Sequence, residues 1–258
     1  MSVVKNYYAT HYGPRQLSGD EGGNRFDKIA PLWEEIRHPM RVLDMGCSAA
    51  SVSEALLEMG HEVHGLDIMA EAVKRARSKG VLAEEWDLNN GLPHAKDPYD
   101  CILALDVLEH LFDPLMVLCQ MHENLADDGY AIIMIPLHFD IRQRIYSLLG
   151  QGIVSYEHKD YSPDHEAWNY FHIRFFTLQE VRRMVRLAGY QIDKERFRPL
   201  YTQDLGKWID TVLPPRLRWH MAQWFPQLLA NGVMLRLRKV QAAHSKLTNA
   251  RSQRAATT

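Results

Sequence analysis

The chain has 258 residues, of which 46% are hydrophobic and 24% are charged, values typical of a globular protein with a substantial core. The formal net charge of -2 gives no basic field for nucleic acid, so no nucleic-acid partner is expected. No apolar run reaches the ~20 residues that span a bilayer, and no apolar leader opens the chain, so we expect a cytoplasmic protein without a transmembrane segment. The three cysteines, Cys47, Cys101 and Cys119, have apolar neighbours and are expected to stay reduced.

From residue 41 onward, strand-like and helix-like segments alternate, which predicts an α/β fold with a parallel sheet covered on both faces. Short runs rich in β-formers predict strands over 41–45, 61–67, 81–87, 99–106, 129–136 and 232–239. Apolar residues at helical spacing predict helices over 50–60, 69–80, 113–129 and 177–189. Asp113 with Pro114 marks the start of the third helix, and a Thr177–Glu180 capping box marks the start of the fourth.

Two long stretches interrupt this alternation within a domain predicted to span 25–240. Residues 137–176 and 199–231 stand where connections of ~2–6 residues are usual. Insertions in an α/β fold commonly form lids or substrate pockets, so we expect an acceptor lid there. Residues 1–24 are expected to form an N-terminal cap over the cofactor, and residues 241–258 a disordered tail.

The segment 41–67, RVLDMGCSAASVSEALLEMGHEVHGLD, predicts a strand, a loop, a helix and a second strand that ends in an acid. This is the layout of a nucleotide-type cofactor site at the carboxyl ends of parallel strands. Gly46 lets the backbone turn sharply and approach a ligand closely. The loop lacks the second and third glycines of G-x-G-x-x-G, which disfavours a dinucleotide such as NAD.

Acidic residues stand at the ends of the first three predicted strands: Asp44, Asp67 and Asp87. S-adenosylmethionine carries an ammonium, a sulfonium, a ribose and an adenine, and the three acids match those groups in chain order. Asp67 is placed to accept both ribose hydroxyls, and Asp87 lies near the expected adenine amino group. Two alternatives stay open, because Asp44 can organise its own loop through hydrogen bonds and Asp67 can cap the next helix.

The motifs VLDMGC, GLD, WDL, YDCILALDVLEHLFDP and LADDGYAIIMIP follow one another in this chain. With them, residues 25–239 resemble the class I S-adenosylmethionine-dependent methyltransferases, in particular the type 11, 12 and 23 group, which includes quinone and glycan O-methyltransferases. The resemblance implies a Rossmann-like, mostly parallel seven-stranded sheet with an antiparallel last strand. It also implies S-adenosylmethionine as cofactor, with contacts from Asp44, Gly46, Cys47, Ser48, Asp67, Ile68, Asp87, Leu88 and Leu105.

This chain departs from the family pattern at Ser48 and Ala50, where glycine is usual. A side chain at a position that requires positive φ costs ~1–2 kcal/mol. The departure keeps a second function open, a non-catalytic binding protein with a degenerate donor site. Among enzymes, O-methylation is the first expectation, and N- or C-methylation of the acceptor is the alternative.

His110 follows the fourth predicted strand, beside the expected methyl group, and is the first candidate for a catalytic base. His138 ends the fifth strand and faces the same expected cleft, so it is the second candidate. The resemblance further leaves a divalent metal open as a second cofactor, because an acid-x-x-Glu-His cluster binds one in some quinone O-methyltransferases. Asp106, Glu109 and His110 fit that pattern on one helical face, but a buried, hydrogen-bonded His110 remains an alternative.

Aromatic and basic residues in the two insertions are candidates for contact with the acceptor, which we expect to be a small molecule, a glycan or a lipid-linked molecule. In the first insertion these are Tyr156, Tyr161, Trp168, Tyr170, His172 and Arg174. In the N-terminal cap over the cofactor, the candidates are Tyr7, Tyr8 and Tyr12. In the second insertion, aromatic residues alternate with cations at Lys207, Trp208, Arg216, Arg218, Trp219, Trp224 and Phe225. That pattern predicts either a peripheral membrane contact or a helical cap at the sheet edge. The oligomeric state is left open.

Overall fold

The computed structural model describes residues 26–150, 172–200 and 214–240. The expectations for the cap, for the tail and for the aromatic residues of 151–171 lie outside the described residues. Lys207 and Trp208 lie outside them as well. The predicted lid is therefore described only in part and remains a prediction.

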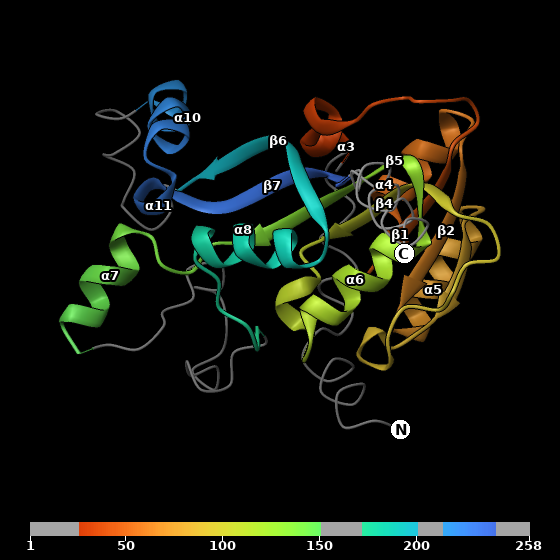
Figure 1. Cartoon of the computed structure of the whole chain (residues 1–258), viewed down its shortest axis with the longest axis horizontal. Coiled ribbons are helices and arrows are strands. Elements are labelled where there is room, and N and C mark those ends of the chain that lie inside the picture. Colours follow the sequence, from red (N-terminus) through yellow and green to blue (C-terminus); the bar gives the residue numbers. More distant parts are fainter. Residues whose placement is uncertain (1–25, 151–171, 201–213, 241–258) are drawn as a thin grey trace, which may run out of the picture.

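A seven-stranded mixed sheet forms the centre of the molecule, with the strand order β3-β2-β1-β4-β5-β7-β6 (Figure 1). The strands are β1 Arg41–Met45, β2 Glu62–Asp67, β3 Leu82–Glu85, β4 Tyr99–Leu105, β5 Leu125–Pro136, β6 Tyr190–Pro199 and β7 Ala230–Lys239. Neighbouring strands from β3 to β5 pair in parallel, and β7 is antiparallel to both β5 and β6. This confirms the predicted Rossmann-like sheet with an antiparallel last strand.

Helices cover both faces of the sheet, as the alternation of segments predicts. On one face lie α3 Phe26–Ile29, α4 Ser51–Glu58 and α5 Ala70–Ser78, and on the other lie α6 Pro114–Asn124, α8 Leu178–Leu187 and α10 Pro215–Trp224. Successive residues of β4 point to opposite faces of the sheet. Cys101 and Leu103 pack on the face covered by α4 and α5, and Ile102 packs on the face covered by α6 and α8. Both layers are apolar, so the central strands carry almost no polar side chains.

The structure differs from the sequence prediction in three respects. The helix predicted over 113–129 ends at Asn124, because Leu125 already pairs with Tyr99 as the first residue of β5. Strand β6 was not predicted, because half of the residues in its sequence YQIDKERFRP are charged, as can occur in an edge strand with one solvated face. The insertions contain three helices that were not predicted with bounds: α7 Ile141–Leu148, α10 and α11 Pro226–Leu229.

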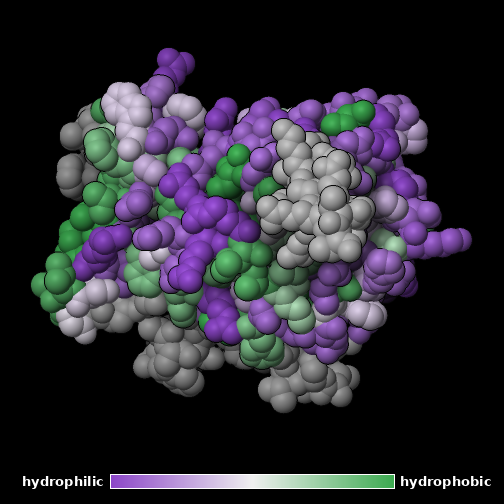
Figure 2. All heavy atoms as spheres, in the orientation of Figure 1, coloured by the Kyte–Doolittle hydropathy of each residue, from purple (hydrophilic) through white to green (hydrophobic). Residues whose placement is uncertain are grey.

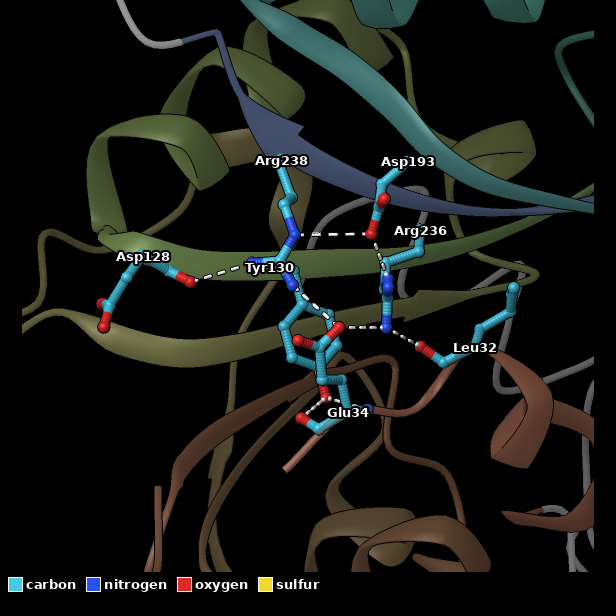
Figure 3. A network of polar contacts seen from close by, with 7 residues as sticks. All are labelled: Leu32, Glu34, Asp128, Tyr130, Asp193, Arg236 and Arg238. Atoms are coloured by element: carbon cyan, nitrogen blue, oxygen red, sulfur yellow. Dashed lines mark hydrogen bonds and ion pairs between the residues drawn. The ribbon is translucent and has the colours of Figure 1, made fainter. Parts of the chain in front are cut away.

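A polar network ties the N-terminal part of the domain to its last strands (Figure 3). The side chain of Arg236, which is 4% exposed, lies 2.5 Å from a carboxylate oxygen of Glu34 and 2.5 Å from one of Asp193. Arg238 contacts the same two acids, at 2.8 Å and 3.3 Å. The Tyr130 hydroxyl donates to the Glu34 carbonyl at 2.7 Å. The segment after the short helix η2 Ala30–Leu32 is thus fixed against β5 and β7.

Among the described helices, none has both the length and the apolar character needed to cross a bilayer. The described cysteines are free thiols, two of them buried. Burial raises the pKa of the Cys47 thiol, so it is unreactive at neutral pH.

Candidate active site

The loop after β1 turns sharply at Gly46, which has a φ of +67°. A side chain is excluded there for a second reason, since an added Cβ would lie 2.6 Å from Cγ2 of Val107. The Gly46 and Cys47 N–H groups both donate to the Leu66 carbonyl, at 2.7 Å and 3.1 Å. The turn is therefore anchored to the end of β2, where Asp67 stands.

Ser48 and Ala50, which stand where the family usually has glycine, both keep the left-handed backbone conformation that favours glycine. Ser48 has a φ of 49° and Ala50 a φ of 62°, both in the left-handed region. Ala50 is also the N-cap of α4 and offers no side-chain cap to its N–H groups. The energetic cost predicted for these two side chains therefore applies to this loop.

Asp67 joins the two loops that follow β1 and β2. Its carboxylate accepts hydrogen bonds from the Ser48 N–H at 2.9 Å and from the Met69 N–H at 2.8 Å. Burial raises the pKa of the Asp67 carboxyl, and these N–H groups partly oppose the shift. Asp67 does not cap the next helix, because the N-cap of α5 is Met69, which makes no side-chain cap bond.

Asp44 and Asp87 stand at the same edge of the sheet as Asp67, because the parallel strands that carry them end together. Asp44 is 4% exposed and accepts a hydrogen bond from the Ser53 hydroxyl at 2.6 Å, which holds α4 against β1. Asp87 accepts from the Asn89 N–H at 3.0 Å as the cap of η3 Leu88–Asn90. Asp44 thus organises its loop, as one alternative foresaw, and its contact with an ammonium group stays a prediction.

The remaining predicted cofactor residues lie at this edge with different exposures. The side chains of Cys47 and Leu88 pack in the hydrophobic core, and their contacts with a cofactor stay a prediction. Ile68 and Leu105 are half-buried at the ends of β2 and β4. Three carboxylates and an N-terminus of α4 without a side-chain cap fit the polar groups of S-adenosylmethionine, whereas the role of each residue stays a prediction.

A cluster of Glu109 and three histidines lies at the carboxyl ends of β4 and β5. His110 ends η4 Leu108–His110, His138 follows β5, and His172 comes from the segment before α8. The Glu109 side chain is fully buried, and its Oε1 lies 3.8 Å from Nε2 of His110 and 3.7 Å from Nε2 of His172. The Glu109 carbonyl accepts from Ile173 and Arg174, both at 3.0 Å, and this pairing brings His172 into place.

Hydrogen bonds fix the tautomers of two of these histidines. The Phe176 N–H donates to Nδ1 of His138 at 3.3 Å, so neutral His138 carries its proton on Nε2. That nitrogen lies 2.9 Å from Nδ1 of His172, which must accept, so neutral His172 carries its own proton on Nε2. The His172 N–H therefore points toward the Glu109 carboxylate.

The pattern proposed for a metal does not form as predicted. Asp106 has a left-handed φ of 55° and precedes a three-residue 3-10 turn, so the three residues do not share one helical face. Glu109, His110 and His172 do lie close enough to surround an ion. A metal ion there would have to displace the proton that Nε2 of His172 carries in the tautomer described above. A divalent metal at Glu109, His110 and His172, rather than at Asp106, Glu109 and His110, stays a prediction.

The structure brings together both predicted catalytic residues and adds His172, which sequence reasoning did not place beside them. His172 was predicted to contact the acceptor, and it lies between His110 and His138, with ring centroids 4.8 Å and 5.1 Å away. Nothing in the sequence marks this contact, since the two loops are far apart along the chain. Arg174 lies at the rim and donates to the Phe112 carbonyl.

Comparison with known proteins agrees with this fold and with a cofactor site at the carboxyl ends of its parallel strands. A family model described as a methyltransferase domain, Methyltransf_23, matches residues 11–195. A ubiquinone biosynthesis O-methyltransferase of Ruegeria pomeroyi is 27% identical over 61% of this chain and 63% of its own length. The enzyme of the same name from Paraburkholderia phymatum is 26% identical over 66% of this chain and 74% of its own. The match thus spans about two thirds of the length of these relatives.

Solved structures show the same fold at low identity. A S-adenosylmethionine-dependent methyltransferase from Thermotoga maritima aligns with a TM-score of 0.59 and 16% identity over 93% of this chain and 100% of that chain. Phosphoethanolamine N-methyltransferase 2 of Haemonchus contortus, in complex with S-adenosylmethionine, aligns with a TM-score of 0.63 and 14% identity. The alignment covers 93% of this chain and 61% of that chain.

The sheet order, the β1 loop and the acidic strand ends define a Rossmann-like domain of the class I methyltransferase type. Because the family model covers more than half of the chain, the protein belongs to the Methyltransf_23 methyltransferase family, whose cofactor is S-adenosylmethionine.

Proposed function

We propose that this protein transfers a methyl group from S-adenosylmethionine to an oxygen atom of its acceptor, with His110 as the base. The observation that carries the proposal is the Glu109 carboxylate, buried between two imidazoles at the strand ends where the methyl group is expected. Transfer to a neutral amine needs no base in the displacement step, whereas a hydroxyl must lose its proton. The relatives named as O-methyltransferases support the same choice.

His110 is the histidine of the cluster best suited to accept a proton. The Nδ1 lone pair of His138 is engaged by the Phe176 N–H, and that of His172 by His138. Burial, followed by the charges of His110 and Arg198, lowers the pKa of His138 to about 4, so His138 stays neutral at physiological pH. The His110 side chain is 14% exposed, whereas the His172 side chain is 5% exposed.

Glu109 acts on His110 as the acid of a catalytic triad acts on its histidine. S-adenosylmethionine supplies an electrophilic methyl group bound to a sulfonium. As the acceptor oxygen bonds to that methyl carbon and the carbon–sulfur bond breaks, His110 takes the hydroxyl proton and becomes an imidazolium. The Glu109 carboxylate, 3.8 Å away, stabilises this positive charge inside a buried site. The sulfonium becomes a neutral thioether, so charge and atoms balance.

The identity of the acceptor rests on the named relatives and on the polar rim of the site. The relatives act in ubiquinone biosynthesis, which supports an acceptor that carries a hydroxyl group. Within our proposal the acceptor is a small molecule, a glycan or a lipid-linked molecule, and exposed Arg174 contacts an anionic group on it.

The test compares His110→Ala with His94→Ala, a substitution of an exposed histidine outside the cluster. We expect His110→Ala to lower kcat by roughly 10²–10⁴-fold on a hydroxyl acceptor while donor binding, measured by calorimetry, is unchanged. His94→Ala should leave both quantities unchanged, and a chelator should leave the wild-type rate unchanged. Full activity of His110→Ala would refute the role of the base. A wild-type protein that binds no donor would instead support the non-catalytic alternative.

A further inference from the structure

The helix α7 presents a row of apolar side chains to solvent. Ile141, Ile145 and Leu148 are 36%, 49% and 86% exposed, and Leu149 is 70% exposed. Their spacing of four, three and one residues places them on one face of the helix. Arg142 and Gln143 are buried on the other side, where Arg142 pairs with Asp140 at 2.9 Å. The apolar row therefore has no partner within the described part of the fold.

Helices α10 and α11 present a second apolar group, rich in aromatic rings. Trp219, Trp224 and Phe225 are 43%, 71% and 58% exposed, and Leu217 and Leu228 are 42% and 38% exposed. Apart from Ala222, which is fully buried, little of α10 packs into the core. Trp and Phe at this exposure are uncommon on a surface that faces only water.

The two apolar groups belong to one end of the molecule. A shallow cavity has walls from Arg144 of α7, from Gln227 of α11 and from the first residues of α8, so these helices lie beside one another. Figure 1 places α7, α10 and α11 together at the left, at the end of β7 and β6. In Figure 2 hydrophobic residues gather over α7 at that same edge. We call the exposed residues of α7, α10 and α11 the apolar end.

The charge of the apolar end is exclusively positive. No Asp or Glu occurs in 141–150 or in 214–229, whereas Arg144 and Arg216 are exposed and Arg218 is half-buried. The chain as a whole carries a net charge of -2, so this concentration of cations on one end is local. Cations interleaved with Trp, Phe and Leu complement an anionic lipid surface, where the rings enter the headgroup layer and the arginines meet phosphates.

The apolar end adjoins the candidate active site. Leu137 and Phe139 line the cavity, and they flank His138 in the sequence. Helix α7 starts three residues after His138, and α11 leads directly into β7. A surface held against the apolar end would therefore lie close to the carboxyl end of β5, from which a lipid-linked acceptor would approach. This last step rests on the proposed function, but the docking itself does not.

We propose that the apolar end docks this protein on the surface of anionic lipid bilayers. The contact is peripheral: the side chains of α7, α10 and α11 enter the headgroup region, and the sheet remains outside. Docking is carried jointly by apolar burial and by the arginines, so both kinds of substitution weaken it.

The test is co-sedimentation of the full chain with vesicles of phosphatidylcholine alone or mixed with phosphatidylglycerol. We expect binding to the mixed vesicles only, weakened by added salt. The double variant Leu148→Ser with Trp224→Ser should lose binding at least about tenfold, because two deeply exposed apolar groups are removed. Arg144→Gln with Arg216→Gln should weaken it by about fivefold for each arginine replaced.

The control variants replace residues of the same type and similar exposure that lie outside the apolar end. Leu82 and Leu187 are 61% and 62% exposed on β3 and α8, so Leu82→Ser with Leu187→Ser should bind as the wild type does. Arg183→Gln with Arg186→Gln on α8 serves the same purpose for charge.

Three results would overturn the proposal: no wild-type binding to mixed vesicles, equal losses in the control variants, or a wild-type dimer that Leu148→Ser with Trp224→Ser converts to monomer without any vesicle binding. Because the assay needs no methyl transfer, its failure is independent of the proposed function.

Discussion

At the scale of single residues, Ser48 adopts a backbone conformation that glycine reaches without strain. Its φ of 49° costs a residue with a Cβ ~1–2 kcal/mol. Ser48→Gly should therefore raise the free energy of unfolding by about 1 kcal/mol, part of the gain being offset by the greater freedom of glycine in the unfolded chain. Urea unfolding followed by circular dichroism measures this change.

Ser51 provides the matched control for that substitution, because it is three residues away and begins α4 in a helical conformation. Ser51→Gly should lower the free energy of unfolding by roughly 0.5 kcal/mol, since glycine is a poorer helix former. Opposite signs for the two glycine substitutions are the expected result. If both destabilise the protein, the strain argument for the loop is wrong.

His138 makes stability depend on pH. Burial, then the charges of His110 and Arg198, lowers its pKa to about 4, whereas in the unfolded chain it is near ~6.5. The unfolded state therefore binds more protons than the folded state between those two pH values. The contribution of His138 to the free energy of unfolding is complete above about pH 6.5 and is lost as the pH falls toward 4. The span is up to about 3 kcal/mol.

His138→Gln removes this titration, so the loss of stability between about pH 7 and pH 5 should be smaller than in the wild type. Urea unfolding at several pH values measures the two slopes. His94→Gln, on an exposed histidine, should keep the wild-type slope. Identical slopes for all three proteins would mean that His138 does not titrate with a lowered pKa.

At the scale of elements, the start of α8 rests on a capping box that the sequence predicted. The Glu180 N–H donates to the Thr177 hydroxyl at 3.2 Å, and the Thr177 N–H donates to the Glu180 carboxylate at 2.8 Å. Thr177→Ala should cost ~1 kcal/mol of stability, measured as a lower urea midpoint. Gln179→Ala, exposed one residue before Glu180, should change it by less than about half of that. Equal decreases of the urea midpoint in the two variants would show that the capping box does not stabilise α8.

How far the sequence predicts an element depends on whether its pattern is local. Strand β1 has the predicted bounds, because its apolar run is bounded by charge and by Gly46. The end of α6 was misplaced, because Leu125 is equally suited to a helix and is drawn into β5 by its pairing with Tyr99. Strand β6 could not be predicted from its sequence, because its charged residues do not form a strand-like pattern and it is held by pairing with β7. Pairing between distant segments leaves no local pattern.

The same limit applies to the candidate site. The acids at the ends of β1, β2 and β3 could be predicted, because each belongs to its own strand and parallel strands end together. The contact between His172 and His138 could not, because it depends on how the chain returns after α7. The role of Glu109 as the buried partner of two histidines follows from that same return.

At the scale of the whole molecule, Glu34 connects the first described segment to the last strand, which lies 204 residues farther along the chain. Its carboxylate contacts Arg236 and Arg238 (Figure 3). Removing the charge of Glu34 leaves buried Arg236 with Asp193 as its remaining carboxylate partner in this network. A cation deprived of part of its pairing in a buried position destabilises the fold.

We therefore expect Glu34→Gln to lower the free energy of unfolding by about 2 kcal/mol, less than the loss of a fully buried pair because Glu34 is 40% exposed. Glu35→Gln is the control on the adjacent residue, which is 47% exposed and contacts only His38 and His61 among the ion pairs described, at 3.4 Å and 3.8 Å. It should cost less than about 0.5 kcal/mol. Urea unfolding measured by tryptophan fluorescence gives both values, and a loss in Glu34→Gln no greater than in Glu35→Gln would show that the network does not hold the two ends of the domain together.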